Sequence, residues 1–273
     1  MELEQLLNRL WKDYIDQNPH AKKVYDLFIN KGNKIVDDHI AFRTFDDPRV
    51  DINVLASVFQ KHGYKEKNEY DFHKKHLYAK HYEHPSGKYP RIFISQLLLD
   101  EFSEELKLIA QKQIDRIPAN ILQSDELLFS GTVWSPIRYA IYEKLRKESE
   151  YAAWLYVNGY RTNHFAISIN HLDTFDDIYE LNSFLKDHGF IMNNSNGEVQ
   201  GSPEVLLEQS SIKAGKQKLQ FEEGAHEVPT CYYEFTKRYK DDEGDKYSGF
   251  IAKSADKIFE STDQYDLELY RNT

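Results

Sequence analysis

The sequence has 273 residues, of which 40% are hydrophobic and 14% aromatic, enough apolar material for a substantial core in one or two domains. Its 35 basic and 45 acidic residues give a formal net charge of −10, which argues against a surface built to hold phosphate backbones, so we expect no nucleic-acid partner. The single cysteine, Cys231, excludes an internal disulfide and favours a reducing compartment.

The start of the chain and its hydropathy predict a cytoplasmic protein. The first residues, MELEQ, are acidic where a signal peptide is basic. No apolar run approaches the length of a transmembrane segment, so we expect no membrane partner.

Residues 1–34 are predicted to form a helical lead-in of two segments, because apolar residues recur at helical spacing on both sides of Asn18-Pro19. Residues 35–98 are predicted to form a first module of one strand, one helix and about three further strands. The ranges we expect are a strand at 39–45, a helix at 53–62 ended by Gly63, and strands at 70–82 and 91–98 with a turn at 85–87.

Residues 99–160 are predicted to be a helical insertion, because their apolar residues again follow helical spacing. Residues 161–240 are predicted to form a second module. It should contain a strand at 164–169, a helix at 175–187, and strands at 202–209, 218–221 and 230–236. The remaining residues, 241–273, mix charges with aromatics and are predicted to pack as a cap. The whole chain, 1–273, is thus predicted to form a single domain.

Two stretches of the chain are near copies, and each begins with a histidine. The first opens on DHIAFR around His39 and reaches KHGY at His62; the second opens on NHFAIS around His164 and reaches DHGF at His188. The two histidines of each copy are 23 and 24 residues apart. The repeat indicates two equivalent strand-helix units whose strands lie side by side, each offering an imidazole to one shared site.

Strand alternation identifies a third ligand for such a site. It places Arg43 on the face of His39, and in the closing strand it places Glu234 on one face with Tyr232, Thr236 and Arg238. If both modules curve around one cavity, Glu234 points where the histidines point. Two histidines and one carboxylate form the open arrangement favoured by non-haem Fe(II), and the same ligands suit zinc. Residue types alone do not separate the two metals.

Another group of histidines is close together in sequence but does not predict a metal site. On a strand, His73 and His76 face opposite ways, and His73 lies roughly 26 Å from His81 at about 3.3 Å per residue. We therefore expect this group, which also contains His84, to be mostly exposed. The acidic residues Glu222, Glu223 and Glu227 are likewise interpreted as a solvated loop.

The motifs resemble a known family. Residues 38–45, 163–165 and 232–235 are similar to the 2-oxoadipate dioxygenase/decarboxylases, a family long catalogued as a domain of unknown function, as are Ala153-Trp154 and residues 254–262. The module order resembles the wider vicinal-oxygen-chelate superfamily. The resemblance implies an α+β fold of two tandem βαβββ modules that form a cupped sheet around a metal.

The resemblance also implies an activity and its residues. His39, His164 and Glu234 are implied as Fe(II) ligands, and Arg43 as the catalytic and substrate-binding group that holds a substrate carboxylate through its planar fork. The implied partners are a 2-oxo acid and dioxygen, with oxidative decarboxylation of 2-oxoadipate to 2-hydroxyglutarate as the expected reaction. Longer members place further substrate contacts in a later segment, for which the stretch around Ser248 is the candidate.

Two other functions remain open from the sequence. The same metal site could act as a Lewis acid in a hydrolase, an isomerase or a glyoxalase-like lyase. Alternatively, the same cupped sheet could belong to a non-catalytic binding protein, which would keep its ligand when a histidine is lost. The metal and the oligomeric state are not predicted by the residues.

Overall fold

The structure, a computed structural model, describes residues 1–195 and 197–251 and divides into two compact units. The residues from 252 onward, including most of the predicted cap and the motif at 254–262, lie outside the described residues. Unit 1 contains Met1–Asp16, Ile40–Asn163 and Lys216–Val228, and unit 2 contains Gln17–His39, His164–Gly215 and the residues from Pro229 onward. The prediction that the whole chain forms one domain stays a prediction.

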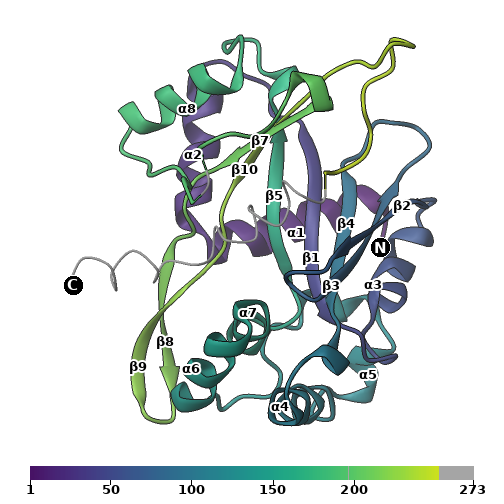
Figure 1. Cartoon of the computed structure of the whole chain (residues 1–273), viewed down its shortest axis with the longest axis vertical. Coiled ribbons are helices and arrows are strands. Elements are labelled where there is room, and N and C mark those ends of the chain that lie inside the picture. The colour runs from purple at the N-terminus through teal and green to yellow at the C-terminus, as the bar shows by residue number, and fades with distance from the viewer. Residues whose placement is uncertain (196, 252–273) are drawn as a thin grey trace. The chain divides into compact units, whose positions relative to one another are not determined.

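Unit 1 contains the first predicted module. Its elements are β1 (Asp37–Phe45, in unit 1 from Ile40), α3 (Ile52–Gln60), β2 (Lys65–Phe72), β3 (Leu77–Glu83) and β4 (Arg91–Leu97). The strands follow the order β2-β3-β4-β1, with β3 antiparallel to both β2 and β4 (Figure 1). Because α3 packs against β3 and β4, its apolar residues cover one face of this sheet.

Unit 2 contains the second module in the same order. Its elements are β5 (Thr162–Ser168, in unit 2 from His164), the 3-10 turn η3 (Ile169–His171), α8 (Ile178–Asp187), β6 (Gln200–Ser202), the 3-10 turn η4 (Pro203–Val205), β7 (Leu207–Ser211) and β10 (Glu234–Arg238). The strand order is β5-β10-β7-β6, which matches β1-β4-β3-β2 position by position. Here α8 packs against β7 and β10, as α3 does against β3 and β4. The predicted α+β class with two βαβββ modules is confirmed.

The two module helices begin and end alike. The side chain of Asp51 accepts a hydrogen bond from the Val54 backbone at the start of α3, and Asp177 caps α8 in the same way. Each helix ends before a glycine with positive φ, Gly63 at 91° and Gly189 at 83°. In a left-handed conformation glycine has no Cβ penalty, so both helices stop at equivalent points of the repeat.

The lead-in and insertion are helical, as predicted. The lead-in forms α1 (Leu3–Gln17) and α2 (Pro19–Asn30). The insertion forms η1 (Leu99–Glu101), α4 (Glu104–Ile114), α5 (Ala119–Leu122), η2 (Asp125–Phe129), α6 (Tyr139–Glu148) and α7 (Glu150–Asn158). In α7 every side chain from Tyr151 to Asn158 is buried, so this helix lies in the core of unit 1. No helix in the described part of the chain is both long and apolar enough to cross a membrane.

Three strand predictions need correction. The single strand expected at 70–82 is a hairpin, in which β2 ends at Phe72 and the chain turns through His76 at a φ of 54°. The strand expected at 202–209 is broken by η4, because Pro203 cannot donate to a sheet ladder. The strand expected at 230–236 begins only at Glu234.

The strand expected at 218–221 has a partner that the prediction lacked. It lies in β8 (Lys216–Phe221), which pairs with β9 (Gly224–Pro229) as a separate hairpin of unit 1. The hairpin lies beside α6 (Figure 1), where the ring of Tyr139 stacks on that of His226 with centroids 3.6 Å apart.

An aromatic cluster anchors the sheet of unit 2 from one side. The ring of Phe28 in α2 contacts Phe175, Phe184 and Phe235, with centroids 5.6, 6.2 and 5.9 Å away. Phe235 is the neighbour of Glu234 in β10, and successive strand residues point to opposite faces. The aromatic cluster therefore fixes the face of β10 opposite to the one that carries Glu234.

Candidate metal centre

The three predicted ligands converge in unit 2. His39 lies in β1, His164 in β5 and Glu234 in β10. Because β10 runs parallel to β5 with Glu234 paired to Ala166, Glu234 shares the sheet face of Ala166 and hence of His164, two residues earlier. Within the described residues they are the one group of three or more histidine, cysteine or carboxylate side chains close enough to hold an ion.

The ligand atoms form a small, buried triangle. The Nε2 atoms of His39 and His164 are 3.3 Å apart, and they lie 3.5 and 3.4 Å from the nearer carboxylate oxygens of Glu234. The three residues are only 2%, 5% and 1% exposed. Bonds from histidine or carboxylate to a metal are about 2.0–2.2 Å long, so two atoms bound to one ion lie at most about 4.4 Å apart. The observed spacings fit a single ion.

The charge state of Glu234 depends on its burial. Burial raises the pKa of the Glu234 carboxyl, and the neighbouring His39 and hydrogen bonds from Gln209 and Thr236 oppose this rise only in part. A bound divalent ion would stabilise the carboxylate form that burial disfavours. The set of two imidazoles and one carboxylate suits Fe(II) and zinc alike, and it leaves coordination positions open for a substrate.

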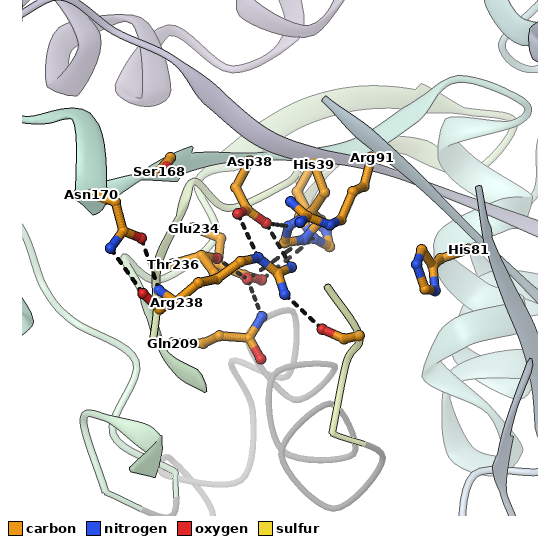
Figure 2. Close-up of polar contacts among 12 residues, drawn as sticks. Asp38, His39, His81, Arg91, Ser168, Asn170, Gln209, Glu234, Thr236 and Arg238 are labelled. Atoms are coloured by element: carbon orange, nitrogen blue, oxygen red, sulfur yellow. Dashed lines mark hydrogen bonds and ion pairs between the residues drawn. The ribbon is translucent and has the colours of Figure 1, made fainter. Parts of the chain in front are cut away.

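Two neighbours orient Glu234. Gln209 of β7 donates a hydrogen bond from Nε2 to Glu234 Oε1 at 2.5 Å, and the Thr236 hydroxyl donates to the same oxygen at 3.2 Å (Figure 2). Gln209 pairs with Thr236 across β7 and β10, which brings both side chains to the ligand. The sequence analysis missed Gln209, since only the register between strands reveals its position.

A carboxylate orients His39. The Nδ1 atom of His39 lies 2.9 Å from Asp38 Oδ1, which directs Nε2 toward the other two ligands (Figure 2). Asp38 in turn accepts two hydrogen bonds from the guanidinium of Arg238, at 2.7 and 2.9 Å. On the other histidine, the Tyr232 ring stacks on His164 with centroids 4.5 Å apart. Neither the Asp38 nor the Arg238 contact was predicted.

Arg43, the predicted carboxylate-binding residue, lies in unit 1. It is 2% exposed, and its guanidinium carbon lies 4.9 Å from the ring centre of Tyr151 and 5.1 Å from that of Trp154. Tyr151 is itself fixed, because its hydroxyl donates to the Ser95 carbonyl at 2.6 Å and accepts from the Thr44 backbone at 3.0 Å. Two rings on α7 thus hold the planar cation of Arg43 in one orientation.

Ser248, the second predicted substrate contact, lies in a short segment of unit 2, residues 247–250. Ser248 is half-buried, and the carbonyls of its neighbours Tyr247 and Gly249 accept hydrogen bonds from Arg238 Nη1 at 3.0 and 2.7 Å. The ring of Phe250 meets that of His39 edge-on, with centroids 4.9 Å apart. The segment is therefore held beside a ligand, while the role of Ser248 itself stays a prediction.

The histidines at positions 73, 76, 81 and 84 form no common metal site in the described residues. The expectation that they are mostly exposed was wrong for one of them. His73 is exposed, as predicted, whereas His81 is fully buried. His81 points into unit 1, where Nδ1 lies 2.8 Å from the Tyr70 hydroxyl and Nε2 lies 3.4 Å from Glu83. The difference in burial between His73 and His81 was not predicted, because the single strand expected there lacked the hairpin turn that separates the two residues.

The duplicated βαβββ topology and the cluster of two histidines and one carboxylate define a vicinal-oxygen-chelate-like fold with a candidate metal centre. A sequence profile of the family described as 2-oxoadipate dioxygenase/decarboxylase matches residues 2–242. The 2-oxoadipate dioxygenase/decarboxylase, chloroplastic/amyloplastic, of Oryza sativa subsp. japonica is 36% identical, over 96% of this chain and 79% of the relative. The chain belongs to this family, which confirms the resemblance found in its motifs.

Solved structures support the same grouping. The crystal structure of the hydroxyglutarate synthase in complex with 2-oxoadipate from Oryza sativa has a TM-score of 0.89 and 34% identity, and the match covers 97% of this chain and 93% of that one. A crystal structure from Shewanella frigidimarina, provisionally described as a hydrolase, has a TM-score of 0.87 and 45% identity and covers 92% of this chain and 98% of that one.

Proposed function

We propose that this protein is an Fe(II)-dependent dioxygenase/decarboxylase that converts 2-oxoadipate to 2-hydroxyglutarate. The observation that carries the proposal is the buried triangle of His39, His164 and Glu234 in a chain of this family. Two relatives support the substrate, since one is named for 2-oxoadipate and the other was crystallised with it.

The ligand triangle supports the metal-dependent part of the reaction. In the proposed enzyme, Fe(II) held by the three ligands would supply open positions for the oxo acid and a means of reducing dioxygen. The carboxylate of Glu234 would offset part of the ion's charge, and Gln209 keeps that carboxylate in one orientation. The reaction consumes one dioxygen and releases one carbon dioxide, and the electrons come from the oxo acid itself, so no separate reductant is needed.

Arg43 is the residue we propose for substrate capture. A 2-oxo dicarboxylic acid carries a negative charge at each end, and a guanidinium can bind a carboxylate through two parallel, charge-assisted hydrogen bonds. The Tyr151 and Trp154 rings restrict the guanidinium to one plane, which lowers the entropy lost when a carboxylate binds. We propose Ser248 as a second substrate contact, because Arg238 holds the backbone on both sides of it.

The test is anaerobic reconstitution with Fe(II), followed by addition of 2-oxoadipate and oxygen. The expected result is equal amounts of oxygen consumed, carbon dioxide released and 2-hydroxyglutarate formed. Turnover of a substrate with zinc and without oxygen would instead identify the Lewis-acid alternative, the hydrolase, isomerase or lyase. Binding of 2-oxoadipate that persists in a His39→Ala variant, without turnover in either protein, would identify a binding protein.

We also propose the cytoplasm as the location, supported by the single, buried Cys231. The relative from Oryza sativa is named as chloroplastic/amyloplastic, so the compartment differs between members of the family if the proposal holds. Fractionation of the native cells, with the protein detected by an antibody, tests it.

A further inference from the structure

We propose that Asp38 and Arg238 are positioning residues, which orient the metal-binding imidazole of His39 and fasten the 247–250 segment against it through one buried ion pair. The inference rests on the proposed metal site and adds a requirement to it. Metal affinity and the attachment of the segment should depend on the same guanidinium.

Asp38 contacts the imidazole ring of His39. Asp38 Oδ1 lies 2.9 Å from the Nδ1 atom of His39, whereas the Nε2 atom lies 3.3 Å from that of His164. A carboxylate that accepts the Nδ1 proton fixes the ring orientation and makes Nε2 a better electron donor to an ion. Asp38 is 4% exposed, so water does not compete freely for this contact.

The negative charge of Asp38 is balanced by Arg238. A lone carboxylate with so little exposure would be costly, but Arg238, 3% exposed, donates to both of its oxygens from Nε and Nη2. The backbone of Arg238 is held as well, since it exchanges two hydrogen bonds of 2.9 Å with the side chain of Asn170 (Figure 2). The guanidinium therefore has a fixed place from which to hold Asp38.

Arg238 has a further donor atom, Nη1. Its Nη1 atom donates to the carbonyls of Tyr247 and Gly249, so one planar group binds Asp38 on one edge and the 247–250 segment on another. Phe250 closes the arrangement, because its ring lies 5.1 Å from the guanidinium carbon and 4.9 Å from the His39 ring. A lysine could not make these contacts together, as it has a point charge rather than a fork.

The experiment compares Arg238→Lys and Asp38→Asn with the wild type and with Arg146→Lys as the matched control. Arg146 also pairs with a partly buried carboxylate, Glu143, but on the surface of α6 in unit 1. Co(II) affinity is measured anaerobically by titration of the visible absorption. Amide hydrogen exchange of residues 247–250 is measured by mass spectrometry on the metal-free proteins, and thermal unfolding checks that each variant folds.

We expect Co(II) affinity to fall about 10- to 100-fold in both site variants and to stay unchanged in the control. Amide hydrogen exchange at residues 247–250 should be faster in metal-free Arg238→Lys than in the metal-free wild type. This result is expected even if the site binds no metal, because no metal is present in the measurement. If Arg238→Lys does not fold, Asp38→Asn and Phe250→Leu carry the same comparison. Folded variants with wild-type affinity and exchange would overturn this inference and leave the proposed function standing. A wild type that binds no metal would overturn both.

Discussion

Gln209 and Glu234, from the neighbouring strands β7 and β10, are joined by a hydrogen bond of 2.5 Å. Glu234 Oε1, which accepts this bond, also lies 3.5 Å from the Nε2 atom of His39, while Oε2 lies 3.4 Å from the Nε2 atom of His164. Gln209 is 3% exposed, so its amide has little access to water in place of the carboxylate. The orientation of Glu234, the proposed acidic ligand, is thus determined by a residue from the adjacent strand.

Replacing Gln209 by leucine should weaken metal binding about 10- to 100-fold, because the carboxylate loses a donor that holds it in place. The measurement is an anaerobic titration with Co(II) or Fe(II). Gln200→Leu is the matched control, since Gln200 lies in β6, where it pairs with Gln209, and its side chain donates to the Gly197 carbonyl instead. Equal affinity in the two variants would contradict the orienting role of Gln209.

His39→Ala should abolish metal binding and turnover, since it removes one of the three proposed ligands of a site that fits a single ion. His73→Ala is the control: it removes an exposed histidine of unit 1 from the group that the sequence places close together. The bound metal per protein chain is counted by elemental analysis after dialysis. Metal retained by the His39 variant and lost from the His73 variant would reverse the assignment.

Arg43→Lys should raise the KM for 2-oxoadipate on the order of 10- to 100-fold and change kcat much less, because lysine cannot form the paired hydrogen bonds of a guanidinium. Steady-state oxygen consumption measures both parameters. The Arg146→Lys variant is the control, because it makes the same arginine-to-lysine substitution on α6. A large fall in kcat with an unchanged KM would mean that Arg43 acts on the transition state rather than in substrate capture.

Acid should destabilise the protein partly through His20. Burial lowers the pKa of His20, and a hydrogen bond to the Cys231 carbonyl, 2.8 Å from Nε2, opposes this shift only in part; the same Nε2 atom lies 3.2 Å from the Gly215 backbone nitrogen. The unfolded chain, with a pKa of about 6.5, then binds more protons than the folded one. His20 therefore costs stability as the pH falls through about 6.5 toward the lower folded pKa, and not above that range.

The check is chemical denaturation of the wild type and a His20→Gln variant between pH 5 and 8. The free energy of unfolding should fall less steeply with acid in the variant than in the wild type. His188→Gln, which replaces an exposed histidine at the end of α8, is the comparison variant. A wild-type slope in His20→Gln would show that this group contributes nothing to acid sensitivity.

Local patterns, together with the family resemblance, predicted the three residues that converge in the structure. Alternation along three strands and the repeat around His39 and His164 depend only on the neighbours of each residue in sequence. For this reason the module order and the sheet faces could be predicted before the structure. The caps Asp51 and Asp177 were not predicted, although a cap also depends on neighbours in sequence.

Contacts set by register or by distant packing could not be predicted. Gln209 reaches Glu234 only because β7 pairs with β10 in one register, and Arg238 reaches Asp38 across the sequence from another strand. The rings that hold Arg43 come from α7, whose place in unit 1 depends on the whole insertion. The turn at His76 uses a φ of 54°, which is uncommon for any residue other than glycine and leaves no clear sequence signal.

The face of β10 that carries Phe235, opposite to Glu234, affects how this protein can evolve. Phe235 packs into the aromatic cluster of α2 while Glu234, one residue earlier, faces the ion site. A change of ring size at Phe28 would therefore move the carboxylate's strand without touching any group that contacts the ion. Natural variation in α2, a helix that contributes no candidate ligand, would in this way alter the position of Glu234 in the proposed metal centre.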